Sequence, residues 1–290
     1  MQTAPECLSC LRHQAERTAR LVTSEPARQQ AIMAEVAALL PRFDLALSPP
    51  ENATTMYRLI AECSGVADPY AAIKRQSNEL ARTLLPAVQE RIQTAADPLF
   101  AAIQYAMAGN VIDYGAHHEL DVEKTMASCL EQVPAICDYQ PFRRDLAACR
   151  TVLYLADNCG ELLFDGLLIK QLKREVTVAV KGRPIINDAL VDDARACGID
   201  RLARVVSNGT GCPGTPLTMV REEFGRLFQQ ADLVISKGQG NFETLSECHR
   251  PVYFLLTVKC QVVADHMASR CGHPVAIGAT LLLRHSPAGR

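Results

Sequence analysis

The chain has 290 residues, enough for about two domains at the usual ~150 residues each. Hydrophobic residues make up 48% and charged residues 21%, which excludes a disordered chain, and no apolar run approaches the ~20 residues of a membrane-spanning helix. Thirty Lys and Arg against 32 Asp and Glu leave a formal net charge of −2. A sequence-independent nucleic-acid binder usually carries a positive excess, so that class is disfavoured. Because no signal peptide is visible, we expect a cytoplasmic protein that acts on small molecules.

Twelve cysteines are many for this length, but they are scattered, and Cys7 and Cys10 form the one close pair. A secreted disulfide scaffold is shorter and denser in cysteine, so we expect most of these thiols to pack as small hydrophobic side chains. A structural zinc site needs four ligands, and the sequence shows no second pair to complete one. Packing is therefore the favoured role of Cys7 and Cys10, and metal binding stays open.

The first half of the chain predicts one helix after another. Apolar residues recur at helical spacing, as in Ile73, Leu80, Leu84 and Val88, which places them on one helix face. Helices are expected over residues 7–22, 25–40, 54–62, 69–95, 99–108 and 122–131. No convincing alternating strand precedes residue 150, so we predict an α-helical region over residues 1–149.

From Arg150 onward, short β-branched runs alternate with helical stretches. Strands are expected at residues 151–156, 176–180, 202–206, 233–235 and 252–256, and helices at 161–172, 188–197 and 217–228. This alternation is typical of βαβ units, in which helices cover both faces of a parallel sheet. We therefore predict an α/β protein whose mainly parallel sheet lies in a domain spanning residues 150–290.

Polar residues follow the predicted strands, at the sheet edge where α/β proteins bind ligands. Asp157 and Asn158 follow the first strand, and Asn187 and Asp188 follow the second, with Asp192 one turn further on. Hard oxygen ligands of this kind suit Mg²⁺ or Mn²⁺. Taken singly, an Asp after a strand is more often a helix N-cap, so the prediction of a metal site depends on the convergence of these residues.

The remaining loops at this edge suit an anion. Residues 207–215 and 238–241 are glycine-rich and stand before helices; the second loop includes Gly238, Gly240 and Asn241. Such loops can present backbone N–H groups to a phosphate. Lys259, after the fifth strand, is a mobile cation suited to a phosphate oxygen. Metal ligands, N–H groups and a lysine at one edge together indicate phosphoryl chemistry.

One motif favours a different ligand. Gly209-Thr-Gly211-Cys-Pro-Gly214 matches the G-x-G-x-x-G fingerprint of dinucleotide-binding proteins. It follows the third strand of the domain rather than the first, and Pro213 removes one N–H donor. A nucleotide- or dinucleotide-binding protein without hydrolase activity is therefore the second hypothesis, and methyl transfer is a weaker third.

Several short motifs occur in order through nearly the whole chain: Cys7-Leu-Ser-Cys10, Asp68-Pro-Tyr70 with Lys74 and Asn78, Gly109-Asn-Val-Ile-Asp113, Asp157-Asn-Cys-Gly-Glu161, Lys181-Gly-Arg-Pro-Ile-Ile-Asn-Asp188 with Asp192, Pro213-Gly-Thr215, Lys237-Gly-Gln-Gly-Asn-Phe-Glu243 and Lys259-Cys260. Together they resemble the DUF89 family, the metal-dependent damage-control phosphatases also described as ARMT1-like. The likeness is closest to archaeal and bacterial members with an N-terminal Cys-x-x-Cys.

This resemblance implies an N-terminal α-helical region and a Rossmann-like α/β domain. It also implies a divalent metal (Mn²⁺, Co²⁺, Ni²⁺ or Mg²⁺) held at Asp157, Asn158 and Asp188, with a phosphate contacted by Lys259. It suggests that the stretch with Asn110 and Asp113 closes over the metal site, although from the residues alone these side chains could equally cap a helix end. The stretch 207–212 departs from the family pattern, which has an acidic residue where Thr210 and Gly211 stand.

The leading hypothesis is a metal-dependent phosphatase that hydrolyses phosphomonoesters of small metabolites, such as sugar phosphates or damaged phosphometabolites. Asp157 and Lys259 are the candidate catalytic residues: Asp157 ranks first as a ligand and alternatively as a nucleophile, and Lys259 neutralises phosphoryl oxygens. The candidate phosphate or substrate contacts are Asn187, Asp192, Gly238, Gly240, Asn241, Lys259, Asn110 and Asp113. We expect no nucleic-acid or membrane partner. The sequence predicts neither the metabolite nor the oligomeric state.

Overall fold

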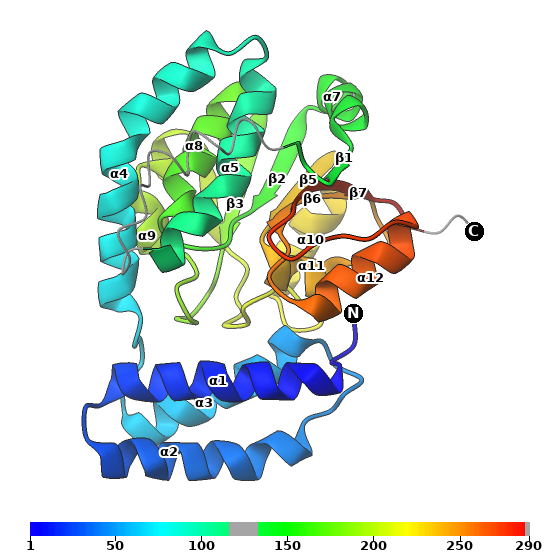
Figure 1. The fold of residues 1–290 in the computed structure, drawn as a ribbon. Coiled ribbons are helices and arrows are strands. Elements are labelled where there is room, and N and C mark those ends of the chain that lie inside the picture. The colour runs from blue at the N-terminus through cyan, green and yellow to red at the C-terminus, as the bar shows by residue number, and fades with distance from the viewer. Residues whose placement is uncertain (116–132, 288–290) are drawn as a thin grey trace.

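The chain begins with a layer of three helices that lies against one end of the remaining α/β body (Figure 1). The computed structural model describes residues 1–115 and 133–287, with the side chains of 1–109 and 133–287. The layer consists of α1 (Pro5–Val22), α2 (Pro26–Leu39) with a 3₁₀ turn at Leu40–Arg42, and α3 (Pro49–Ser64). It has a hydrophobic core of its own, which includes Val36, Met56 and Ile60. Ile185, from a loop of the α/β body, joins this core and so fixes the layer to the body.

The described strands form a single sheet: β1 (Ile136–Cys137), β2 (Thr151–Leu155), β3 (Glu175–Val180), β4 (Arg204–Ser207), β5 (Leu233–Lys237), β6 (Val252–Thr257) and β7 (Thr280–His285). Their order is β1-β7-β6-β5-β2-β3-β4, and every neighbouring pair is parallel except β6 and β7. The chain builds outward from β2 through β3 to β4 and then returns to the other side of β2 with β5. This reversal creates a topological switch point between β2 and β5, where α/β proteins bind ligands.

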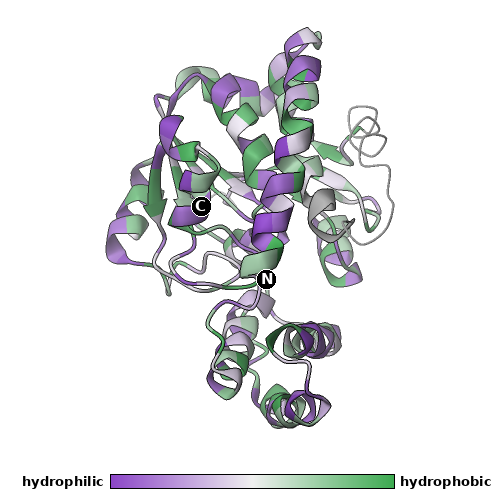
Figure 2. Cartoon of the chain, turned by 90° about the vertical axis from the view of Figure 1, so that its left-hand side faces the viewer, coloured by the Kyte–Doolittle hydropathy of each residue, from purple (hydrophilic) through white to green (hydrophobic). Residues whose placement is uncertain are grey.

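Helices cover both faces of this sheet. One core contains residues of α4 (Ala71–Thr94), α5 (Pro98–Gly115), α7 (Tyr139–Ala148), α8 (Glu161–Leu172) and α9 (Val191–Ala196), together with Ile199 of a 3₁₀ turn at Ile199–Arg201. The other contains residues of α10 (Glu222–Gln230), α11 (Gln239–Leu245) and α12 (Gln261–Cys271). Tyr154 belongs to the first core and Leu153 to the second, because successive strand residues point to opposite faces. α4 faces the viewer in Figure 2 and shows many hydrophilic residues on its outer side.

The fold class predicted from the sequence is confirmed: N-terminal helices are followed by a mostly parallel sheet. Two predicted elements are displaced. The strand expected at 202–206 is β4, which begins two residues later, at Arg204. The helix expected at 217–228 begins only at Glu222, because a turn-rich segment with Pro213 and Pro216 comes before it. The helix predicted at 188–197 is shortened to α9. The helix predicted at 122–131 lies outside the described residues.

The boundary predicted between residues 149 and 150 does not separate two hydrophobic cores. α4 and α5 precede it, yet their buried side chains share a core with β2 and α8. Gly109 of α5 shows how closely these helices pack, because a Cβ at this position would lie 2.8 Å from the Cβ of Glu161 in α8. The α1–α3 layer is the part of the helical region that keeps a separate core, although Ile185 and Ile186 of the body pack into it.

Candidate active site

The three predicted metal ligands come together at the carboxyl edge of the sheet. Asp157 and Asn158 follow β2, and Asp188 lies in the long loop after β3; all three side chains are buried. A single antiparallel β-bridge joins the two loops at Asn158 and Asp188, and the Ala189 N–H donates to the Asp157 carbonyl oxygen at 2.9 Å. The fold therefore joins residues about 30 positions apart into one polar cluster.

Asp188 is the most unusual member of this cluster. Its side chain is 0% exposed, and neither carboxylate oxygen has a hydrogen-bond partner among the described residues. The Lys181 Nζ lies 3.5 Å from Oδ2, too far for a good hydrogen bond. Burial, and then the negative charge of Asp157, raise the pKa of Asp188 to about 8, although Lys181 and Lys259 oppose this shift. A buried carboxylate of this kind needs a cation or a proton as its partner.

Asp157 lies at the switch point between β2 and β5. Gly238 follows β5 with a φ of +78°, and a Cβ at this position would lie 1.9 Å from Oδ2 of Asp157. Glycine is therefore required here both by the backbone conformation and by the close approach of the carboxylate. The Asn158 Nδ2 donates to the same Oδ2 at 3.1 Å, which fixes the direction of the Asp157 side chain.

Lys181 is a residue of the cluster to which the sequence-based prediction assigns no role of its own. It directly follows β3, is 2% exposed, and donates to the carbonyl oxygen of Gly214 at 2.7 Å and to Asn241 Oδ1 at 3.2 Å. Thr215 donates to the same Oδ1 at 2.7 Å. Lys181 thus brings a positive charge to Asp188 while it ties three loops together. Its signal in the sequence was a lysine directly at a strand end, between an apolar run and a glycine.

A second buried lysine, Lys237, lies beneath the cluster. Its Nζ is 2.7 Å from Asp165 Oδ1 and 3.6 Å from Glu161 Oε1, and Tyr154 also donates to Asp165 Oδ1 at 2.7 Å. Burial opposes the charge of Lys237, but Asp165 and Glu161 outweigh it, so the pKa of Lys237 is raised. Because Glu161 Oε1 accepts the backbone N–H of Asn158 at 3.1 Å, this network supports the loop that carries the predicted ligands.

Lys259 follows β6 at the same edge and is exposed. It forms no ion pair with any residue that the structure describes, and its backbone N–H donates to Gln239 Oε1 at 2.8 Å. Its charge acts on the pKa values of both Asp188 and Glu243, which places it within electrostatic reach of the carboxylate cluster. An exposed cation beside buried carboxylates is suited to meet an anionic ligand.

The glycine-rich stretch 238–241, expected as a loop before a helix, is the N-cap and first turn of α11, and its glycines are explained by packing. The Gly238 N–H donates to the Leu255 carbonyl oxygen at 3.0 Å, so it is already used within the protein. A Cβ on Gly240 would lie 1.9 Å from the carbonyl oxygen of Pro213. Asn241 donates to the carbonyl oxygens of Ala156 and Lys237 and accepts from Lys181 and Thr215. Contacts of Gly238, Gly240 and Asn241 with a phosphate stay a prediction.

The polar residues predicted after β3 differ in their exposure to solvent. Asn187 is buried beside Asp188, whereas the Asp192 side chain is 93% exposed and pairs with Arg195 at 3.1 Å. The structure therefore does not bring Asp192 into the buried cluster. Its neighbour Asp193 accepts from the Leu190 N–H at 3.0 Å and from Lys74 of α4 at 3.1 Å. Asn110 and Asp113 fall in the last turns of α5, and their side chains lie outside the described part of the chain.

The G-x-G-x-x-G motif does not have the geometry of a dinucleotide site. Its loop does not open a helix, because α10 begins eight residues after Gly214. A Cβ on Gly209 would lie 2.3 Å from Cγ of Arg221, and one on Gly214 would lie 2.6 Å from the carbonyl oxygen of Gly240. These glycines allow close packing between loops, which explains the motif without a cofactor.

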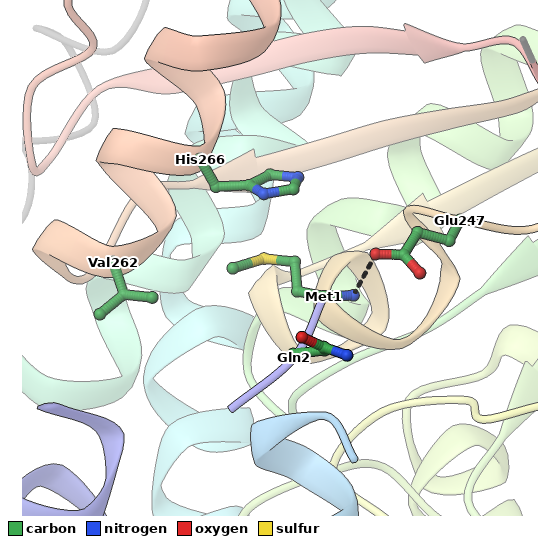
Figure 3. Close-up of a pocket in the computed structure, with 5 residues that line it drawn as sticks. All are labelled: Met1, Gln2, Glu247, Val262 and His266. Carbon is green, nitrogen blue, oxygen red and sulfur yellow. Dashed lines mark ion pairs between the residues drawn. The ribbon is translucent and has the colours of Figure 1, made fainter. Parts of the chain in front are cut away.

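Nowhere in the described residues do three His, Cys, Asp or Glu side chains form a group that could hold a metal ion, and no described helix combines the length and apolar character needed to cross a membrane. A pocket at the N-terminus is lined by Met1, Gln2, Glu247, Val262 and His266 (Figure 3). It contains none of the predicted site residues. The Asp157–Asn158–Asp188 cluster, with two carboxylates and a carboxamide, is therefore the best candidate for a cation.

The fold and the cluster define an α/β protein with a buried acidic cluster at the switch point of its sheet and a three-helix layer at one end. A family model described as the damage-control phosphatase ARMT1-like domain matches residues 3–273. The chain therefore belongs to the ARMT1-like (DUF89) family, which confirms the resemblance carried by its motifs.

Known relatives cover almost the whole chain. A damage-control phosphatase of Archaeoglobus fulgidus is 35% identical over 286 residues, which span 95% of this chain and 99% of the relative. A damage-control phosphatase of Pyrococcus horikoshii is 32% identical over 274 residues, 92% of this chain and 94% of the relative. The crystal structure of a DUF89 family protein from Pyrococcus horikoshii matches with a TM-score of 0.91 at 32% identity, over 99% of this chain and 100% of that one.

Proposed function

We propose that this protein is a metal-dependent phosphatase that hydrolyses phosphomonoesters of small metabolites. The observation that carries the proposal is the fully buried Asp188 carboxylate, which lacks a hydrogen-bond partner among the described residues and lies beside Asp157. Relatives that match nearly the whole chain are named damage-control phosphatases. Their name supports sugar phosphates or damaged phosphometabolites as the substrate class.

The residues present fit a divalent cation. Asp157, Asn158 and Asp188 supply carboxylate and carboxamide oxygens, the ligands that Mg²⁺ and Mn²⁺ prefer, and Lys181 offers Asp188 a positive charge only at 3.5 Å. When bound, such an ion would polarise the phosphoryl group and stabilise the charge that develops on it. Mn²⁺, Co²⁺, Ni²⁺ and Mg²⁺ are all candidates.

The chain's own residues supply the remaining parts of the reaction. Lys259 is exposed at the same edge and would bind the phosphoryl oxygens as a point charge. Its contribution grows as charge shifts in the transition state. Lys181 holds the loops around Asp188, and the α1–α3 layer lies over this edge through Ile185, where it would exclude water and select the metabolite.

A panel of phosphomonoesters assayed with each divalent metal tests this function. The chelator-treated protein should release no phosphate, and Mn²⁺ or Co²⁺ should restore the release. A nucleotide or dinucleotide binder without hydrolase activity would bind its ligand with or without metal and release no phosphate under either condition. Phosphate release that is indifferent to chelation would contradict the metal requirement.

A further inference from the structure

The side-chain amide of Gln239 connects two segments of the site. Its Oε1 accepts the backbone N–H of Lys259 at 2.8 Å, and its Nε2 donates to Glu243 Oε1 at 2.8 Å. A longer contact, 3.6 Å, joins Nε2 to the Cys260 Sγ. Gln239 and Glu243 both lie in α11, while Lys259 and Cys260 follow β6. The amide therefore links the start of α11 to the position where Lys259 leaves the sheet.

Glu243 is a buried carboxyl, 7% exposed, that the proposed reaction does not otherwise use. It lies one helical turn after Gln239, so the two side chains meet on the same face of α11. The one side-chain hydrogen bond found for it within the described residues comes from Gln239. Burying this carboxyl beside the site costs free energy, which a purely structural position could avoid with an apolar residue.

The charge of Glu243 and the backbone N–H of Lys259 together determine which way the amide faces. An ionised carboxylate only accepts hydrogen bonds, so it selects the orientation in which Nε2 faces Glu243 and Oε1 faces Lys259. A protonated carboxyl can donate instead, which allows the amide to turn its Oε1 toward Glu243. The Lys259 N–H would then face an amide donor and lose its acceptor.

We propose that Gln239 and Glu243 are positioning residues for Lys259: ionised Glu243 orients the Gln239 amide, and this amide holds the Lys259 backbone so that its ammonium group meets the substrate phosphate. This role rests on the proposed phosphatase function and on the contact between Lys259 and phosphate. It assigns a use to two residues that lie outside the predicted ligand set.

Several charged or titratable groups face Glu243 from neighbouring segments. Lys259 and the amino group of Met1 favour its ionised form, whereas Asp157 opposes it. The thiols of Cys7 in α1 and Cys260 also lie within its electrostatic reach. Burial outweighs the favourable charges and raises the pKa of Glu243 to about 7. Protonation of Glu243 near neutral pH should therefore weaken the hold of the amide on the Lys259 backbone.

Kinetics of four variants test this role. Gln239→Ala, Gln239→Glu and Glu243→Gln should each lower kcat/KM about tenfold at pH 8, the lower end of the effect of removing an outer-shell partner. KM should rise and kcat should fall, because Lys259 acts in both substrate binding and the transition state. The inhibition constant of inorganic phosphate should rise as well. Glu223→Gln, the same change at an exposed position in α10, is the matched control and should match the wild type.

The pH dependence separates positioning from a structural role. The ratio of wild-type to Glu243→Gln kcat/KM should approach one below about pH 6 and rise above pH 7, as Glu243 ionises. A constant ratio, or a wild-type kcat/KM in Gln239→Ala, would overturn the proposal. Gln239 is half-buried, so its alanine variant decides the question if Glu243→Gln does not fold. A wild type without any phosphatase activity would instead overturn the proposed function itself.

Discussion

Asp188 shows how one buried residue can reveal a candidate cation site. Its carboxylate is fully buried, and its pKa is raised to about 8 by burial and by Asp157. Lys181 is the nearest cation, but its shorter contacts go to Gly214 and Asn241. The protein thus keeps a carboxylate whose own surroundings favour protonation, which is unfavourable for stability and useful for a metal.

Among single residues, Lys259 allows the most specific prediction about catalysis. Lys259→Ala should keep the fold and the metal but lower kcat/KM by about 10²-fold or more, the scale observed when one preorganised donor is removed. The reason is that an exposed lysine costs little stability when it is lost, while the phosphate loses a point charge. Phosphatase kinetics and metal content of the variant check this. Unchanged kinetics would discard the phosphate role, and lost metal would mean that Lys259 acts elsewhere.

The raised pKa of Glu243 predicts that the free energy of unfolding depends on pH, whatever the activity of the protein. Its ordinary pKa of 4.5 is raised to about 7 in the folded protein, so between these values the folded state holds a proton that the unfolded chain has lost. The free energy of unfolding should therefore fall as pH rises through this window, by up to about 1.4 kcal/mol per pH unit and about 3 kcal/mol in total.

Urea unfolding at pH 5 and at pH 8 measures how far the free energy of unfolding falls between these two pH values. Glu243→Gln has no proton to lose, so it should gain stability relative to the wild type at pH 8 and not at pH 5. Glu223→Gln, which changes an exposed carboxylate, should follow the wild type at both values. Parallel behaviour of Glu243→Gln and the wild type would show that Glu243 ionises normally.

At the scale of elements, the site exists because β2 and β5 are neighbours. The loop after each strand reaches the switch point, and the two meet where Gly238 leaves room for the Asp157 carboxylate. Gly238→Ala would force a β-carbon into that carboxylate at a φ of +78°. It should abolish metal-dependent turnover and lower the free energy of unfolding by about 1–3 kcal/mol.

Gly225 provides the matched control for this change. It lies in α10 without a positive φ, and a β-carbon added there would meet no atom within 4 Å. Gly225→Ala should therefore keep full activity and be neutral or up to about 1 kcal/mol more stable, because alanine favours a helix. Thermal unfolding and phosphate release of the two variants test the difference; equal activity in both would contradict the role given to Gly238.

The sequence predicted some elements well and others poorly, for physical reasons. β2 and β6 are buried on both faces, so they read as continuous apolar runs that are easy to recognise. β1 has two residues, and α11 has seven, which is too short for a helical period to show. β7 pairs antiparallel with β6 after α12, and no local pattern distinguishes that pairing from another parallel unit.

The candidate ligands were predictable because Asp157, Asn158 and Asp188 follow strands of one sheet. Lys181 and Lys237 were not assigned roles, since a lysine usually lies at the surface and only tertiary contacts show that these two are buried beside carboxylates. The packing of Gly240 and Asn241 of α11 depends on contacts with Pro213 and Thr215, which precede them by more than 25 positions. Such contacts leave no signal in local sequence.

At the scale of the whole molecule, the α1–α3 layer and the sheet edge enclose the site from opposite sides. The layer has its own core, and Ile185 joins it from the loop that also carries Asp188. Movement of the layer would therefore displace the loop that holds this candidate ligand. Under the proposed function, the sheet edge would carry the chemistry and the helices of the layer would select the metabolite.

The most direct test of the metal site is a calorimetric titration of Mn²⁺ into chelator-treated protein, with Asp188→Asn as the comparison. The asparagine keeps the shape of the side chain and removes the buried charge. The wild type should bind a single Mn²⁺ per chain, and the variant should bind it more than about 100-fold more weakly, beyond the loss caused by an outer-shell partner, while its fold by circular dichroism is unchanged. Equal affinity in the two proteins, or no binding to the wild type, would contradict the site.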